Sequence, residues 1–202
     1  MENPMVNYRK IIAETNSKHY NVHDKYKDNT VEQNAAIQKS ESRNFSVGCI
    51  NLTGELNIGM MIRSACLFGA ENFYIFGRKK FDKRSTVGAE KYINIVQYSY
   101  DDPMTADMEM SVDIYELSQS KHHIVLCEQG GDVLGYKYDW RSLIPEMNPL
   151  FLFGSESHGI PQTIIDSNYE RYSIPQVGVL RSFNVAAAMN IIVWDYIKEV
   201  YL

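Results

Sequence analysis

The side chains best suited to chemistry lie in or beside three segments rich in glycine and small polar residues: 51–59, 153–160 and 174–184. Arg63 follows the first segment and is the strongest candidate. An arginine guanidinium keeps its proton and carries a planar fork of donors, so it can stabilise negative charge that develops on an oxygen and hold a phosphate. The other candidates for the chemistry are Asn57, Glu156, Ser182 and Asn184.

Each candidate also has a purely structural interpretation. Arg63 could be an exposed helix arginine, and Glu156 a solvated loop carboxylate. Asn57 stands where a helix is expected to begin, so it could serve as an N-cap and also orient Arg63 or contact a substrate. Capping of the C-terminal helix would explain one of Ser182 and Asn184. The chemical interpretation therefore depends on whether the three segments meet in space.

Three other kinds of site fit the sequence poorly. Ser155-Glu156-Ser157-His158-Gly159 is near the nucleophile elbow of hydrolases, but only His158 follows Ser157, immediately beside it, so a triad has no suitable base. The turn Cys127-Glu128-Gln129-Gly130-Gly131-Asp132 lacks the third glycine and helix start of a dinucleotide motif, and is predicted to be a plain hairpin or loop. Adjacent His122 and His123 cannot face one metal ion from a strand, so we expect no metal site.

Short apolar runs alternate with helical patterns from Phe45 onward. Helices are expected within 60–70, where Gly69 is available as a C-cap, and over about 107–120 and 184–200, with another opening at Pro161. Strands are expected at 45–51, 73–76, 93–98, 123–128, 150–154 and 171–175. This alternation predicts an α/β fold with a mostly parallel sheet flanked by helices. Ligands of such sheets bind beyond the carboxyl ends of the strands, where all three polar segments fall.

Composition sets the remaining limits. Residues 1–44 carry seven basic and six acidic residues and few clustered apolar ones, which predicts a partly helical or flexible appendage to a domain over 45–202. No apolar run is long enough to span a membrane.

Three dispersed cysteines suit a reducing cytoplasm or nucleus. The net charge of −5 is unusual for a protein that binds nucleic acid, but one basic run, 78–84, could contact phosphates or be a solvated loop.

The three polar segments, taken together and in order, resemble the motifs of the SpoU/TrmH branch of SPOUT methyltransferases. Asn57-Ile58-Gly59 with Arg63 is similar to the first motif. Residues 152–160, Leu-Phe-Gly-Ser-Glu-Ser-His-Gly-Ile, are similar to the second. Ile174-Pro175 through Ser182-Phe183-Asn184-Val185-Ala186 resembles the third, with Phe183 in place of the usual leucine. Residues 85–92 and 178–196 further resemble the catalytic domain of eukaryotic tRNA (guanosine-2′-O)-methyltransferases, the TAR-RNA-binding-protein-like group.

The resemblance implies a homodimer whose C-terminal segment forms a deep trefoil knot. It implies S-adenosylmethionine (SAM) as cofactor and methylation of a ribose 2′-hydroxyl in tRNA. The enzymes of the resembled group act on the D-loop guanosine of tRNA, which makes that nucleotide one candidate target. Methylation of rRNA, or a catalytically silent RNA-binding scaffold, stays open. The cofactor would be held mainly by backbone groups, at Phe153, Gly154, Ser155, Ile174, Gln176, Ser182 and Phe183. In this context the basic run becomes a candidate RNA contact through Arg78, Lys79, Lys80, Lys83 and Arg84.

Overall fold

A computed structural model describes residues 21–51, 56–78, 80–120, 122–130, 133–134, 138–143 and 148–202. The strands are β1 (Arg43–Asn51), β2 (Ala70–Gly77), β3 (Asn94–Tyr98), β4 (His122–Cys127), β5 (Val133–Leu134), β6 (Asn148–Phe153) and β7 (Glu170–Ser173). The α-helices are α2 (Val31–Ser40), α3 (Leu56–Phe68), α4 (Lys83–Thr86), α5 (Ala106–Ser120), α6 (Gln162–Ile165) and α7 (Val185–Val200). Short 3₁₀ helices are η1 (Asp24–Tyr26), η2 (Ala89–Lys91) and η4 (Trp140–Ser142). None of the described helices is long and apolar enough to cross a membrane.

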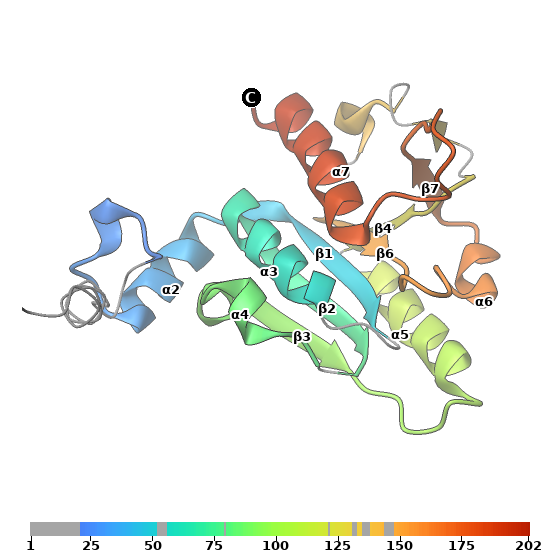
Figure 1. Ribbon diagram of the computed structural model, residues 1–202, viewed down its shortest axis with the longest axis horizontal. Helices are drawn as coiled ribbons and strands as arrows, with labels where there is room; N and C mark the ends of the chain where they lie inside the picture. The colour runs from blue at the N-terminus through green and yellow to red at the C-terminus, as the bar shows by residue number, and fades with distance from the viewer. Residues whose placement is uncertain are drawn as a thin grey trace, which may run out of the picture.

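The strands form one sheet in the order β3-β2-β1-β6-β4-β7-β5, and every strand pair in it is parallel. The predicted α/β class with helices flanking a parallel sheet is confirmed (Figure 1). The trefoil knot stays a prediction. The two-residue strand β5 was not predicted, because two residues are too short to show a periodic pattern.

Alternation along the strands divides the core into two layers. One layer contains Phe73 and Ile75 of β2 and is covered by α3 and α7. The other contains Tyr74 and Phe76 and is covered by α5 and α6. Successive strand residues face opposite sides of a sheet, so each strand serves both layers. The helices α3 and α7 therefore lie together on one face, while α5 and α6 lie on the other (Figure 1).

The carboxyl ends of the central strands lie level with one another. Cys49 of β1 pairs with Phe153 of β6, Phe153 pairs with Cys127 of β4, and Cys127 pairs with Tyr172 of β7. The segments that leave these strands therefore start side by side at one edge of the sheet. This is the edge at which parallel sheets place their ligands.

Helix α2 belongs to the segment before β1 and lies against the end of α3. The side chain of Gln38 donates a hydrogen bond to the backbone oxygen of Cys66 at 3.0 Å. Thr30 and Gln33 form a capping box that fixes the start of α2. Residues 1–20 lie outside the described part of the chain. The division into an appendage over 1–44 and a domain over 45–202 stays a prediction.

Candidate active site

Two of the three predicted segments are joined by a direct hydrogen bond. Asn57 lies in the first turn of α3, and its Oδ1 atom accepts from Nδ2 of Asn184 at 3.0 Å. Asn184 is the N-cap of α7, and its own Oδ1 accepts from the backbone N–H groups of Ala186 and Ala187. The expected capping role of Asn184 is confirmed. Asn57 lies within the helix, so its side chain is available to tie the two helix starts together.

The remaining predicted segment, 153–160, lies next to the Asn57–Asn184 contact. A small hollow of about 30 Å³ is lined by Asn57, Gly154, Ser155, Glu156 and Val185, and by apolar residues of β1 and α3. These residues come from all three motifs. The sequence-based expectation that the three segments converge is therefore met at this hollow, at the carboxyl edge of the sheet.

The second motif is a closed loop whose shape depends on glycine. Ser155 and Gly159 exchange backbone hydrogen bonds of 3.0 and 2.9 Å, which pinch residues 155–159 into a tight turn. A Cβ atom at Gly154 would lie 2.3 Å from the backbone carbon of Gly159. Gly159 has a φ of +69°, which favours glycine. Glu156 projects from this turn and is exposed.

Glu128 and Gln129, which follow β4, are site residues that the sequence interpretation missed. Oε2 of Glu128 accepts from the backbone N–H of Ile160 at 3.1 Å, and therefore anchors the second motif. The side-chain amide of Gln129 donates to the backbone oxygen of Arg181 in the third motif. The loop after β4 thus bridges two motifs. Its position after a central parallel strand is the signal in the sequence that points to these residues, whereas its partial glycine pattern points only to a plain loop.

Arg63 does not face this hollow. It is exposed and lines a separate cavity of about 560 Å³ between α3, residues 86–92 and the segment 21–41. The reason is helix rotation. Each residue advances about 100° around a helix, so Arg63 points roughly 200° away from Met61, which lines the hollow. Within one chain, the predicted catalytic cation and the converged loops lie on different sides of α3.

The predicted cofactor residues are spread from the core to the surface. Phe153 is fully buried at the end of β6, and Ile174 is partly buried against the same core layer as α3 and α7. Gln176, Ser182 and Phe183 are exposed. The loop between β7 and α7 also holds Val177, Val179 and Leu180 in solvent. Exposed apolar side chains of this kind favour contact with a ligand or another protein surface.

The predicted RNA-contact run packs beside the first motif. Asp82 caps the short helix α4, and a Cβ atom at Gly59 would lie 1.9 Å from Oγ of Ser85 and 2.7 Å from the backbone oxygen of Asp82. Glycine at position 59 therefore lets α4 approach α3. Arg78, Lys80, Lys83 and Arg84 are exposed, while Lys79 lies outside the described residues.

One neighbouring carboxylate, Asp82, reduces the basic character of that run. Arg84 forms a two-pronged ion pair with Asp82, with N–O distances of 2.7 to 3.1 Å. The hydrogen bonds from Arg84 lower the pKa of the Asp82 carboxyl. Asp82 therefore stays ionised and offsets one of the four described cations.

The thiols near the site are unsuited to nucleophilic chemistry. Burial, with a smaller contribution from the Glu128 carboxylate, raises the pKa of the Cys127 thiol well above its usual range. Burial also raises the pKa of Cys66, which lines the Arg63 cavity, to about 11. Both side chains are neutral at physiological pH. Among the described residues, no three His, Cys, Asp or Glu side chains come together as a metal site.

Comparison with known sequences places most of the chain in one family model. Residues 44–194 match the SpoU rRNA Methylase family. The mouse (Mus musculus) protein tRNA (guanosine(18)-2'-O)-methyltransferase TARBP1 is 24% identical over 169 residues. The match covers 82% of this chain and 10% of that protein, so the chain spans about a tenth of the length of this relative.

Solved structures share the fold at low sequence identity. The SpoU methyltransferase AviRb from Streptomyces viridochromogenes, in complex with AdoMet, matches with a TM-score of 0.59 and 22% identity over 77% of this chain and 58% of that chain. The TrmH/SpoU tRNA modifying enzyme of A. aeolicus matches with a TM-score of 0.64 and 18% identity over 84% of this chain and 83% of that chain. An AdoMet-bound rRNA methyltransferase from Sinorhizobium meliloti matches with a TM-score of 0.61 and 18% identity, over 82% and 61% respectively.

Proposed function

This chain belongs to the SpoU rRNA Methylase family, and on that premise we propose that it is a SAM-dependent RNA 2′-O-ribose methyltransferase that acts on tRNA. The observation that carries the proposal is the meeting of all three motif segments at one hollow, with Asn57 bonded to Asn184. The similarity to the mouse tRNA (guanosine(18)-2'-O)-methyltransferase supports a guanosine of tRNA as the substrate. The D-loop guanosine implied by the resemblance is part of the same proposal.

Residues at the carboxyl edge of the sheet would hold the cofactor. The candidates are Phe153, Gly154, Ser155, Ile174, Gln176, Ser182 and Phe183. SAM supplies an electrophilic methyl group when it is bound. The hollow itself has room for little more than a water molecule. Part of the proposal is that the exposed loop 174–184 rearranges over the cofactor when it binds. The exposed Val177, Val179 and Leu180 would lose contact with water in that step, which favours closure.

Arg63 would act on the substrate hydroxyl. A ribose hydroxyl is a poor nucleophile, and negative charge must develop on its oxygen as the methyl group is transferred. A fixed guanidinium stabilises that charge and also holds a neighbouring phosphate, which could take up the proton. The guanidinium is unsuited to be the base because it does not release its own proton. Glu156 and Asn57 would position substrate and loops rather than move protons.

A second copy of the chain would complete this site. Arg63 lies in a row of exposed residues on α3 at helical spacing, which we call the α3 stripe: Leu56, Met60, Arg63 and Leu67. On α7, which packs beside α3, Ile191 and Trp194 are also exposed. A homodimer formed through these helices would cover the apolar side chains and bring Arg63 of one subunit to the loops of the other. A knotted C-terminal segment, implied by the family, belongs to the same proposal.

RNA would reach the site across the basic run. Arg78, Lys80, Lys83 and Arg84 are exposed next to α3, and such contacts supply affinity that falls with salt without reading sequence. Lys79 is included in the proposal from its place in the run. The free cysteines suit a reducing cytoplasm or nucleus.

The proposal is tested by incubating the protein with labelled SAM and total RNA and then mapping methylated nucleosides by mass spectrometry. Wild-type protein should methylate a tRNA ribose. Arg63→Ala should abolish transfer and leave SAM affinity, measured by calorimetry, nearly unchanged. Lys39→Ala, which removes an exposed cation from α2, is the matched control and should stay active. Normal turnover by Arg63→Ala would refute the role of Arg63.

Two alternatives have distinct outcomes in the same experiment. A 2′-O-methyl mark that appears only in rRNA would reassign the substrate. Absence of any SAM binding by the wild-type chain would favour a catalytically silent scaffold. The presence of Arg63, Glu156, Ser182 and Asn184 together argues against the silent alternative, because a scaffold would need only Asn184, which caps α7.

A further inference from the structure

Helix α5 carries apolar side chains on the side that faces solvent. Four residues in or just before it are exposed at 94%, 72%, 52% and 57%: Met104, Met108, Val112 and Tyr115. Steps of four, four and three residues place them along one side, and we call them the α5 stripe. The opposite side buries Met110 and Ile114 in the core. The core contacts of α5 therefore leave the stripe free.

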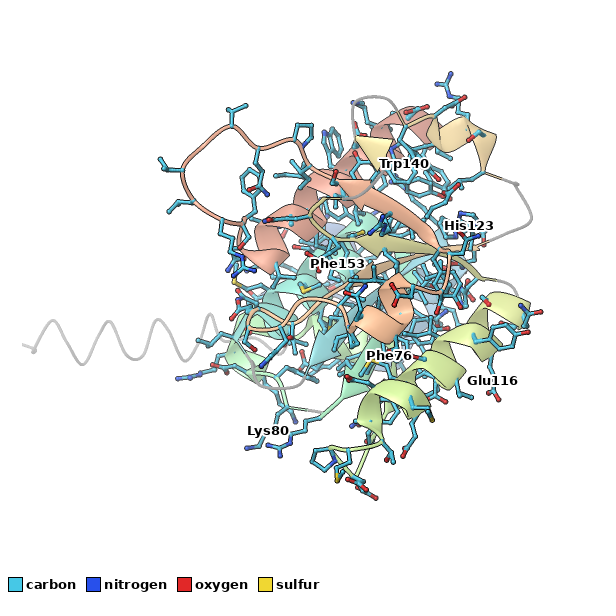
Figure 2. The ribbon with its side chains drawn as sticks, turned by 90° about the vertical axis from the view of Figure 1, so that its right-hand side faces the viewer. Phe76, Lys80, Glu116, His123, Trp140 and Phe153 are labelled. Atoms are coloured by element: carbon cyan, nitrogen blue, oxygen red, sulfur yellow. The ribbon has the colours of Figure 1, made fainter. Side chains whose placement is uncertain are left out.

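Acidic residues border this stripe. Residues 92–120 contain six Asp or Glu and no Lys or Arg, whereas the whole chain has a net charge of only −5. Counted around the helix, Asp107 lies on one side of the α5 stripe, and Glu109 and Glu116 lie on the other. Figure 2 shows Glu116 at the margin of the molecule, pointing away from the sheet. The acidity of the chain is thus concentrated around one apolar surface.

We propose that this surface, the α5 stripe with its acidic borders, docks a protein partner whose own surface combines apolar side chains with lysine or arginine. Apolar contact would supply most of the affinity, and charge complementarity would orient the partner and select it. The proposal is independent of methyl transfer, because α5 lies on the face of the sheet opposite α3 and α7.

Charge argues against the other occupants. RNA and anionic membranes would meet like charge at Asp107, Glu109 and Glu116. A second copy of the chain is also disfavoured, since a two-fold contact places the same patch against itself and would oppose acidic residues to acidic residues. A basic protein is the one class that both features of the surface favour.

The test uses two designed helical peptides of equal length, one of leucine and lysine and one of leucine and glutamate. Binding to the full chain is measured by fluorescence anisotropy. We expect the lysine peptide to bind and the glutamate peptide not to. The double variant Met108→Ser, Val112→Ser should weaken binding by about tenfold or more, because it removes the apolar contact. The double variant Glu109→Gln, Glu116→Gln should weaken binding of the lysine peptide and make that binding less dependent on salt concentration.

Leu202→Ser is the matched control, because Leu202 is equally exposed but follows α7, which lies on the other face of the sheet. It should bind the lysine peptide as the wild-type chain does. Equal binding of both peptides, binding of neither, or unchanged binding by the double serine variant would each overturn the proposal. Displacement of the peptide by RNA, or self-association that the double serine variant removes, would assign the surface to another occupant. None of these outcomes depends on methyltransferase activity.

Discussion

At the scale of single residues, the motif glycines differ in their surroundings. Gly154 is enclosed by backbone, with Gly159 and Ile160 atoms 2.3 to 2.7 Å from the position of an added Cβ. Backbone cannot move aside as a flexible side chain can. Gly178, in the third motif, would place its Cβ more than 4 Å from any neighbour. The sequence presents both as loop glycines, and only the fold distinguishes them.

Substitution should therefore destabilise the chain at Gly154 but not at Gly178. Gly154→Ala should lower the free energy of unfolding by about 1–3 kcal/mol, because the added methyl group overpacks the turn. It should also weaken SAM binding, since it displaces the pinched loop. Gly178→Ala is the control and should leave folding stability nearly unchanged. Urea denaturation and calorimetry measure both quantities, and equal stability of the two variants would contradict the steric explanation.

At the scale of elements, the sequence predicted most of the strands and long helices. Apolar runs marked six strands, and Gly69, with a φ of +81°, ends α3 as expected of a C-cap. The short helix α4 was missed because its basic residues were interpreted as a loop, although Asp82 was a recognisable N-cap. Convergence of the motifs was predictable from the shared edge of parallel strands. The direction of Arg63 was not, because it depends on how α3 is rotated against the sheet.

One carboxylate holds α7 to the sheet. Oδ2 of Asp195 accepts hydrogen bonds from Nε1 of Trp140 at 3.0 Å and from the hydroxyl of Tyr172 at 3.1 Å. Lys198 contributes an ion pair of 2.8 Å on the outer side. Burial acts to raise the pKa of Asp195, but the hydrogen bonds from Lys198, Trp140 and Tyr172 outweigh it and lower the pKa below 3.8. The ionised form of Asp195 is therefore more stable in the folded chain than in the unfolded chain.

Asp195→Ala should reduce the free energy of unfolding by about 1–3 kcal/mol at pH 7, because it leaves two buried donors without their acceptor. The stabilisation from Asp195 is present above the unfolded pKa of about 3.8 and is lost as pH falls through the lower folded pKa. The difference in the free energy of unfolding between Asp195→Ala and the wild type should hence shrink toward pH 3. Lys198→Ala is the control, and loss of its exposed ion pair should cost about 1 kcal/mol or less. Denaturant titrations at both pH values provide the measurement.

At the scale of the whole molecule, the two faces of the sheet present different surfaces. The face of α3 and α7 has exposed apolar residues beside the basic run, whereas the face of α5 has exposed apolar residues with acidic borders. This division reconciles a net negative charge with the proposed RNA substrate, because acidic residues gather around α5, away from the basic run.

The proposed homodimer makes a prediction at this scale. Trp194→Glu should shift the chain from dimer to monomer in light scattering coupled to gel filtration, because it places a charge in the apolar contact of α7. Tyr115→Glu makes a similar change on the opposite face and should stay dimeric. Both side chains are about half exposed, so neither change should unfold the monomer. A monomeric wild-type chain would remove the basis for a shared site.

The rotation of α3 that separates Arg63 from the hollow has a genetic consequence. If the arginine of one protomer serves the loops of its mate, a chain that lacks the arginine and a chain with a damaged Gly154 loop are defective in different halves of each centre. Co-expressed, every mixed pair would contain one undamaged composite centre and one centre that is defective in both halves. Two alleles that are each inactive alone would then complement one another within a single cell.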